Sequence, residues 1–325
     1  MSDRGPRCPV CEAEDFRATR RGLDFVEGAR AFPLECSHCG LLVDRGASRA
    51  VLDAALAASM AASDLRLSPT LPLGFEAYTA RTAALRLGLL FEPADARQVE
   101  ARHAPYHRRP AAGGLRPLAD LDPLAISVAI LCRPQEEAQA RRLAAELGTW
   151  SDDVLLLLDA AEAHEREAEG DGLRLAARPL GGDFSAQRNA AQDLARRDWV
   201  LQLDADETMA PAALSSLGRL AALAERDGCL CVGLPRRNLV DGVLSALHPD
   251  IQYRLNRASV RYRGRVHERP DLPGGWRDSF IAPGAAIDHH LARAHVLSRS
   301  KAYEAMAPGE GRLFEMRRLL TPFHA

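Results

Sequence analysis

Continuous apolar runs alternate with amphipathic segments over residues 123–240. The apolar runs predict buried strands, because side chains on both faces of each would avoid water; they lie at residues 124–132, 153–159, 199–206 and 229–237. Between them, apolar side chains recur at helical spacing over residues 135–147, 184–197 and 210–227. This alternation predicts an α/β fold, with a mixed, mostly parallel sheet covered by helices on both faces.

The pattern differs on either side of this region. Two Ala-rich segments before it, residues 47–63 and 78–91, predict helices, and residues 103–123 are rich in Pro, Gly and Arg, as linkers are. After about residue 238 come short strands and then a basic helical tail from about residue 291. We therefore expect three parts: a small module at 1–45, a helical spacer and linker at 46–120, and the α/β domain at 121–325.

Composition excludes several classes of protein. The 325 residues are 47% hydrophobic and 26% charged, as in globular proteins, and the net charge of −2 favours neither nucleic acid nor anionic membranes as partners. No apolar run is long enough for a transmembrane segment, and the N-terminus lacks the apolar stretch of a signal peptide. Only Lys301 is a lysine, so no GxxxxGK phosphate loop exists. We expect a cytoplasmic protein without a nucleic-acid partner.

Four of the seven cysteines form two CxxC pairs near the N-terminus. They are Cys8 and Cys11 in CPVC, and Cys36 and Cys39 in CSHC. In a cytosolic chain this spacing favours a tetrahedral structural Zn²⁺ site, and four sulfur ligands leave no open position for catalysis. A redox dithiol pair is the alternative. The spacing predicts a zinc-ribbon-like module over residues 1–45.

Asp204 and Asp206 stand at the end of the apolar run 199–206. Ligands of open α/β sheets bind at the carboxyl ends of the strands, and two carboxylates there call for a compensating cation. Oxygen ligands suit Mg²⁺ or Mn²⁺, with diphosphate oxygens filling further positions. The alternative is a solvated acidic turn before a helix.

The run GGDFSAQRNAAQDLARRDWVLQLDADE resembles the central stretch of inverting family 2 glycosyltransferases with the GT-A fold. In that family a D-F-S-x-x-R-N segment leads a helix, and the next strand delivers a D-x-D motif. The resemblance implies that Asp183, Arg188, Asn189 and Asp204 bind the donor, and that Asp206 and Asp204 hold a divalent ion. Asp159, at the end of the second strand, matches the aspartate that reads the nucleotide base.

Later segments extend the resemblance to the acceptor side. QYRLNR and YRGRVHE match there through Gln252, Arg254, His267 and Glu268. An inverting transfer needs a carboxylate to deprotonate the acceptor, so Glu268 is the first candidate for the base and Asp250 the second. An ion pair of Glu268 with Arg265 or Arg269 is the structural alternative. His267 would orient the base or the acceptor.

AAIDHHL resembles the late strand-end histidine that completes the family's metal site. His289 fits this position, with His290 as its substitute. The sequence therefore predicts a metal-dependent inverting glycosyltransferase with a nucleotide-sugar donor and an acceptor that is a glycan, a lipid or a protein. Residues 160–163 and 133–137 depart from the family's pattern. They motivate the alternative, a zinc-ribbon interaction protein with a degenerate, non-catalytic glycosyltransferase-like domain.

Overall fold

A computed structural model describes residues 7–61, 63–167, 173–309 and 312–323. Residues 1–6 of the expected zinc module, residue 62 of the spacer, and residues 168–172, 310–311 and 324–325 of the expected α/β domain lie outside the described residues. The chain divides into two compact units. Unit 1 comprises residues 1–121 with Trp276–Gly284, and unit 2 comprises Asp122–Gly275 with Ala285–Ala325.

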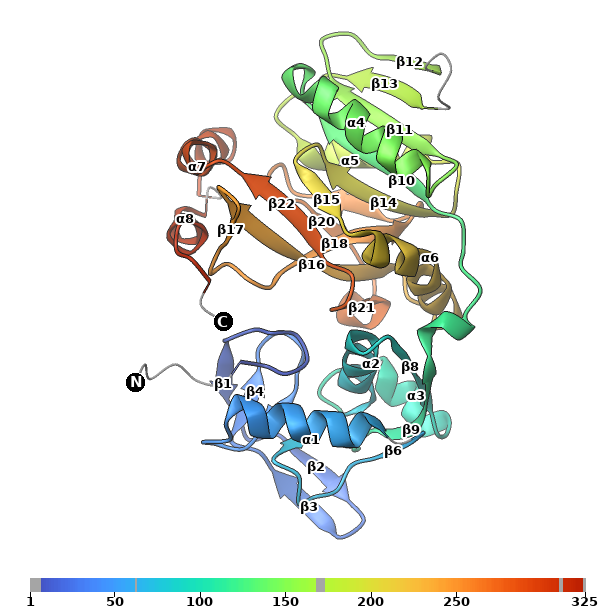
Figure 1. Cartoon of the computed structure of the whole chain (residues 1–325), viewed down its shortest axis with the longest axis vertical. Helices are drawn as coiled ribbons and strands as arrows, with labels where there is room; N and C mark the ends of the chain where they lie inside the picture. The colour runs from blue at the N-terminus through green and yellow to red at the C-terminus, as the bar shows by residue number, and fades with distance from the viewer. Residues whose placement is uncertain (1–6, 62, 168–172, 310–311, 324–325) are drawn as a thin grey trace. The chain divides into compact units, whose positions relative to one another are not determined.

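Unit 2 is built on one large mixed sheet (Figure 1). Its path is β12-β13-β11-β10-β14-β18-β16-β22-β15, and β17 also pairs with β16. The strands are β10 (Ser127–Cys132), β11 (Val154–Asp159), β12 (His164–Glu167), β13 (Arg174–Arg178), β14 (Trp199–Asp204), β15 (Glu207–Met209), β16 (Cys231–Val240), β17 (Val243–Leu244), β18 (Asp250–Arg257) and β22 (Ile287–Leu291). The small hairpin β19 (Arg261–Arg263) and β20 (Arg269–Asp271) lies apart from the sheet.

Four adjacent strands of this sheet are parallel, and most of the remaining pairs are antiparallel. β13, β11, β10 and β14 pair in parallel, whereas β18 pairs antiparallel with both β14 and β16. The unit's helices are α4 (Glu137–Gly148), α5 (Phe184–Leu194), α6 (Pro211–Arg226), α7 (Arg293–Met306) and α8 (Leu313–Leu319). This arrangement confirms the α/β fold class and is consistent with a GT-A-like fold.

Burial on both faces explains the continuous apolar runs. One face of the parallel strands, including Ala129, Leu131 and Leu155, shares a core with Ala191 of α5. The alternate side chains, such as Val128 and Ile130, are equally buried. Helix α4 packs along β10 and β11, and α6 packs along β16 and β18. Because neither face reaches water, strict apolar–polar alternation is absent from these strands.

The described part of unit 1 combines short strands with three α-helices. A four-stranded sheet has the order β1-β4-β5-β7, a second has the order β6-β9-β8, and β2 pairs with β3. The strands are β1 (Phe16–Ala18), β2 (Gly22–Phe25), β3 (Gly28–Ala31), β4 (Leu34–Cys36), β5 (Leu42–Val43), β6 (Asp64–Arg66), β7 (Leu73–Gly74), β8 (Leu89–Pro93) and β9 (Ala112–Pro117); the helices are α1 (Arg49–Ala61), α2 (Ala77–Arg86) and α3 (Ala96–Arg102).

Residues 46–120 differ from the helical spacer and linker that we expected. Helices α1 and α2 form at the two Ala-rich segments, but residues 89–93 are strand β8, and strand β9 crosses the expected linker. Gly113 permits the pairing, because a Cβ there would lie 2.1 Å from the carbonyl oxygen of Glu92. One core joins the four CxxC cysteines to side chains of α1 and α2, so residues 8–111 pack as one body.

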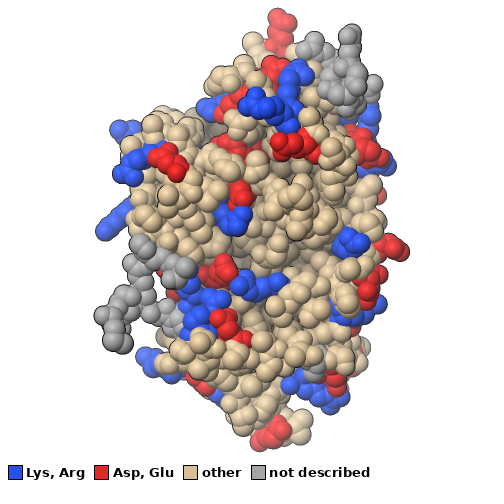
Figure 2. Space-filling view, in the orientation of Figure 1, with Lys and Arg blue, Asp and Glu red and all other residues tan. Residues whose placement is uncertain are grey.

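Two properties of the described residues bear on the expected partners. None of the described helices combines the length and hydropathy needed to cross a membrane. The face drawn in Figure 2 shows basic and acidic side chains interspersed rather than gathered by sign, in keeping with the net charge of −2.

Candidate functional site

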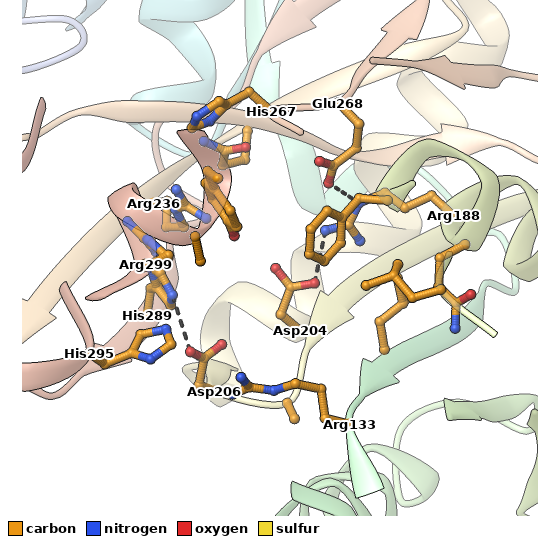
Figure 3. Close-up of a pocket in the computed structure, with 18 of the residues that line it drawn as sticks. Arg133, Arg188, Asp204, Asp206, Arg236, His267, Glu268, His289, His295 and Arg299 are labelled. Atoms are coloured by element: carbon orange, nitrogen blue, oxygen red, sulfur yellow. Dashed lines mark hydrogen bonds and ion pairs between the residues drawn. The ribbon is translucent and has the colours of Figure 1, made fainter. Parts of the chain in front are cut away.

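A cavity of about 430 Å³ opens in unit 2 at the carboxyl ends of the parallel strands. Parallel pairing places Leu131 of β10 opposite Asp204 of β14, so the ends of these strands meet at one edge. The cavity brings together eight of the predicted site residues: Asp159, Arg188, Asp204, Asp206, Asp250, His267, Glu268 and His289. Figure 3 shows most of them pointing toward the same space.

Asp204 is held by two arginines. One carboxylate oxygen accepts from Arg188 at 2.8 Å, and the other accepts from Arg254 at 2.9 Å. Burial raises the pKa of Asp204 to about 6, against the lowering effect of Arg188. The adjacent Glu207 is fully buried, its carboxylate accepts from the backbone N–H of Asp204 at 3.0 Å, and burial raises its pKa to about 8. Glu207 is therefore buried beneath the turn, whereas the side chains of Asp204 and Asp206 stay 32% and 31% exposed.

Asp206 and His289 lie next to each other in the cavity. The Oδ2 atom of Asp206 lies 3.3 Å from Nε2 of His289 (Figure 3). His289 is 3% exposed, and burial, assisted by Arg236, lowers its pKa to about 4. The ring is therefore neutral at pH 7, the form in which imidazole binds metals.

His290 points away from this pair, because successive side chains of a strand face opposite sides. Its Nε2 lies 2.8 Å from the hydroxyl of Thr208, and the residue is exposed. Of the two adjacent histidines at the end of β22, the structure brings only His289 into the cavity.

Glu268 contacts arginines other than those we considered. Its Oε1 accepts a hydrogen bond from Nε of Arg188 and lies 3.7 Å from Nη1 of Arg254. Arg265 instead donates to the carbonyl of Gly182, and Arg269 donates to that of Ile251. Because Arg188 also binds Asp204, a single buried guanidinium bridges the strand-end aspartate and Glu268.

Asp250 is bound tightly by Arg236. Its Oδ2 accepts from two nitrogens of Arg236 at 2.6 and 2.9 Å, and its Oδ1 accepts from Gln252 at 2.6 Å. Burial acts to raise the pKa of Asp250, but Arg236 outweighs it and lowers the pKa to about 2. This carboxylate is a weaker base than an ordinary aspartate.

His267 lines the cavity beside Glu268 and packs edge-on against Tyr303, with ring centroids 5.4 Å apart. Its φ of 54° is left-handed, a conformation that non-glycine residues adopt at a cost. Burial lowers the pKa of His267 to about 4. The turn thus holds a neutral ring next to the candidate base.

Asp183 and Asn189 support the cavity from outside its lining. Gly181 and Gly182, both with positive φ, turn the chain so that Asp183 caps α5, where its Oδ1 accepts from the N–H of Ala186 at 3.0 Å. Asn189 exchanges two hydrogen bonds with the backbone of Tyr262 in β19. Asp159 lines the cavity, and one of its oxygens accepts from the N–H of Leu180 at 2.8 Å.

Two residues at or beside the cavity were not identified in the sequence: Arg236, which lines it, and Asn238, which is buried next to it. They alternate along β16 in the same way that Asp250, Gln252 and Arg254 alternate along β18, so these polar side chains share one face of the sheet. That alternation was visible in the sequence. One face of α7 also lines the cavity, through His295, Ser298, Arg299, Ala302, Tyr303 and Met306.

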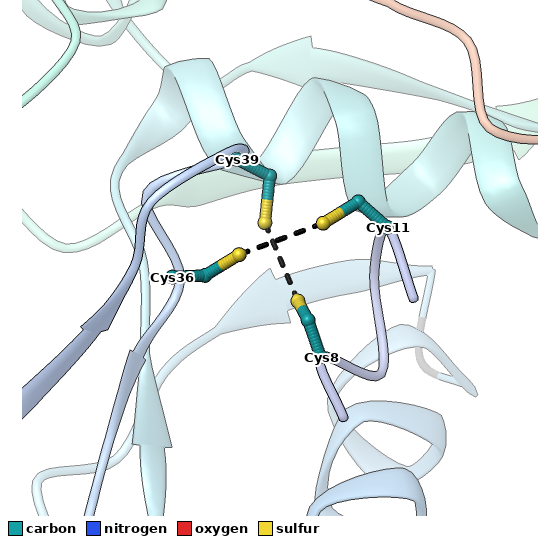
Figure 4. Close-up of side chains that lie close together, drawn as sticks. All are labelled: Cys8, Cys11, Cys36 and Cys39. Carbon is teal, nitrogen blue, oxygen red and sulfur yellow. Dashed lines mark hydrogen bonds between the residues drawn. The ribbon is translucent and has the colours of Figure 1, made fainter. Parts of the chain in front are cut away.

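The four CxxC cysteines meet in unit 1 (Figure 4). Their sulfur atoms all lie within 4.8 Å of one another, and the Cys8–Cys39 and Cys11–Cys36 pairs are 3.5 Å apart. In each turn the first cysteine's carbonyl accepts from the N–H four residues on, where Glu12 and Gly40 have φ of 67° and 80°. All four side chains are buried, and the cluster could bind a metal ion such as zinc.

No protein-family model matches the chain. Solved structures similar to part of it include S. aureus TarS, at 11% identity and a TM-score of 0.34, covering 61% of this chain and 42% of that one. TarS 1–349 in complex with UDP-GlcNAc is 12% identical, with a TM-score of 0.32, and the match covers 52% of this chain and 58% of that one. The chain thus spans less than half of the first TarS chain. At this level of similarity, function has to be argued from the chain's own residues.

Proposed function

We propose that the chain is a metal-dependent inverting glycosyltransferase of the family 2 type, with a nucleotide-sugar donor. The observation that carries the proposal is the cavity at the strand ends. It combines a carboxylate and a neutral imidazole, Asp206 and His289, with a glutamate, Glu268, that reaches the same space from the acceptor-side turn.

The donor set fits a divalent ion. Ligands at adjacent corners of an octahedral Mg²⁺ site lie about 3 Å apart, since each metal–oxygen bond is about 2.1 Å. Asp206 Oδ2 and His289 Nε2, 3.3 Å apart, match that spacing. Asp204 is engaged by arginines, so we assign Asp206 and His289 as the main ligands and Asp204 as a supporting one. A bound Mg²⁺ or Mn²⁺ would neutralise the diphosphate of the donor.

The protein's own groups supply the rest of the chemistry. Glu268 accepts the proton of the acceptor hydroxyl as that oxygen forms a bond to the anomeric carbon, and the bond to the nucleoside diphosphate breaks on the opposite face. Arg188 fixes the orientation of the Glu268 carboxylate through Nε. Asp250 is the weaker candidate because two bonds from Arg236 outweigh the effect of burial and lower its pKa to about 2. Asp159 is assigned to the nucleotide base, and His267 to orienting Glu268 or the acceptor.

Unit 1 has a different assignment in this proposal. Zn²⁺ bonds to sulfur are about 2.3 Å long, which places the sulfurs of a tetrahedral site about 3.8 Å apart. The two 3.5 Å pairs approach that geometry, so we assign the cluster to a structural Zn²⁺. Metal-bound thiolates and cysteines outside disulfides are typical of a reducing compartment such as the cytoplasm, where we place the protein.

A thermal-shift panel tests the proposed function. Nucleoside diphosphates and nucleotide sugars are added to the full chain with and without Mn²⁺, and slow hydrolysis of each donor is followed. A ligand that binds only the folded protein raises the melting temperature, because it stabilises the fold by about 2.7 kcal/mol at a hundred times its Kd. Stabilisation by one nucleotide class only with Mn²⁺, together with donor hydrolysis, supports the enzyme. A panel without any shift or hydrolysis would favour the non-catalytic interaction protein.

A further inference from the structure

Asn238 is a fully buried amide that the proposed chemistry does not use. It lies on β16, and the parallel pairing with β22 places it opposite His289. Its side chain contacts three groups: the ring of His289, the carbonyl of Leu247 and the carboxylate of Asp250. It therefore lies between the candidate metal ligand and an acceptor-side carboxylate.

These contacts fix which way the amide faces. Nδ2 of Asn238 donates to the Leu247 carbonyl at 3.2 Å and to Oδ2 of Asp250 at 3.3 Å. The reversed amide would set its oxygen against both of these acceptors and lose both bonds. Oδ1 of Asn238 is thus the atom that faces Nδ1 of His289 at 2.8 Å. An amide oxygen only accepts, so Nδ1 of His289 must carry the proton.

The tautomer of His289 follows from this bond. With the proton on Nδ1, Nε2 is the ring nitrogen that faces Oδ2 of Asp206, 3.3 Å away. A positive charge between these two atoms, either a proton on Nε2 or a cation, stabilises their approach. The ring is therefore oriented as a ligand by a neighbour that itself would not contact an ion.

We propose that Asn238 is a positioning residue that holds His289 in the Nδ1–H tautomer, so that Nε2 and Asp206 are presented together to a divalent cation. The presence of the cation rests on the proposed function, whereas the assignment of the His289 tautomer does not. The same amide braces Asp250, and this links the metal side of the cavity to its acceptor side.

The first test measures the binding of Mn²⁺ alone to the full chain. The electron paramagnetic resonance signal of the free ion reports how much Mn²⁺ stays unbound. Asn238→Leu removes the acceptor for Nδ1 and should weaken Mn²⁺ binding about 10–100-fold, the usual cost of losing such a partner. Asn238→Asp keeps an acceptor for Nδ1 but sets its second oxygen against Leu247 and Asp250, so it should recover only part of the affinity lost in Asn238→Leu. Thr208→Val removes the partner of His290 and should change nothing. Unchanged affinity in Asn238→Leu would overturn the proposal.

The second test observes the ring itself in metal-free protein. Long-range ¹H–¹⁵N correlation spectra at pH 8 should show the proton of His289 on Nδ1 in the parent, and on Nε2 in Asn238→Leu, where Asp206 is the remaining acceptor. A parent ring with its proton on Nε2 alone, or an unchanged tautomer in the variant, contradicts the proposal even where the Asp variant does not fold. Absence of Mn²⁺ binding in the parent, with the expected tautomers, would refute the metal dependence and leave the role of Asn238 standing.

Discussion

The chain carries two clusters of candidate metal ligands, and they differ in what surrounds them. In unit 1, four buried cysteine sulfurs lie within 4.8 Å of one another, enough for a complete tetrahedral set. In unit 2, Asp206 and His289 offer two candidate ligands at the wall of a cavity that arginines and further carboxylates also line. A closed set of ligands stabilises a fold, whereas an open one leaves positions for a substrate.

The polar groups around each cluster show the same contrast. The cysteine turns are braced by backbone groups and by Thr79, whose hydroxyl donates to the carbonyl of Cys39 at 2.7 Å. The strand-end cluster is braced by charges, with Arg188, Arg236 and Arg254 each bound to carboxylates. Burial of so many charges costs stability, and such an arrangement is typical of sites that bind charged ligands.

The largest effect should come from the cysteines. Replacing Cys8 and Cys11 together by Ser removes two ligands, and structural zinc contributes about 10–16 kcal/mol in zinc-finger peptides. The parent should hold about one zinc per chain, measured by atomic absorption. The double variant should lose it and destabilise unit 1, where the cysteines share one core with α1 and α2, while unit 2 still melts cooperatively. Cys229→Ser, a buried thiol outside the cluster, should retain the zinc. Stoichiometric zinc in the double variant would contradict the assignment.

Glu268→Gln should have the next largest effect. Loss of a general base lowers turnover about 10²–10⁴-fold, and affinity for the donor should stay nearly constant because Glu268 lies on the acceptor side. Donor turnover and donor binding are measured on the same preparation. His267→Ala should lower turnover less. Glu225→Gln, at an ion pair with Arg257 outside the cavity lining, is the control.

A different outcome would change the role of Glu268. If Glu268→Gln lowers the melting temperature and leaves turnover per folded molecule intact, the residue is a structural partner of Arg188. The base would then be Asp250, and Asp250→Asn should lower turnover about 10²–10⁴-fold, the loss otherwise expected for Glu268→Gln.

Asp206→Asn should remove the effect of the divalent ion. The amide keeps the shape of the side chain but lacks its charge, so the Mn²⁺-dependent stabilisation by a nucleoside diphosphate, about 2.7 kcal/mol at a hundred times Kd in the parent, should vanish. Asp204→Asn should weaken it less, since arginines hold that carboxylate. Asp152→Asn, at an exposed ion pair with Arg197, is the control. Parent-like shifts in both cavity variants would make the acidic turn purely structural.

The smallest effect concerns acid stability in unit 2, at the opposite end of the strands. Burial acts to raise the pKa of Asp153, but Ser127, the N–H of Arg196 and the guanidinium of Arg174 lower it overall. The stabilisation is therefore complete above the unfolded pKa of about 3.9 and is lost as pH falls through the lower folded pKa. A tenfold difference between the folded and unfolded acid dissociation constants corresponds to about 1.4 kcal/mol.

Urea unfolding between pH 5 and 3 measures this loss. The parent should lose stability over that range, and Asp153→Asn should show a flatter profile. Asp152→Asn, one residue away and exposed, should follow the parent. Parallel profiles for Asp153→Asn and the parent would show that Asp153 does not contribute to the acid response.

Sequence patterns that span a few residues were enough to predict much of this protein's structure. The CxxC turns and the D-x-D at the end of an apolar run were identifiable because each is set by its own neighbours along the chain. The alternation of strands and helices over residues 123–240 predicted the α/β class for the same reason. The prediction of a linker from the Pro- and Gly-rich residues 103–123 was wrong. Gly113 lies in β9 and allows the backbone of this strand to approach Glu92 of β8 closely.

Tertiary structure alone decided how the charges pair. The sequence offered Arg265 and Arg269 as neighbours of Glu268, but the partner is Arg188, which lies 80 residues away on α5. His289 rather than His290 enters the cavity, and Asn238 meets it, because the register of β16 with β22 assigns alternate side chains to each face. A shift of one residue would exchange the faces. That register depends on strands far apart in the chain, so no local pattern encodes it.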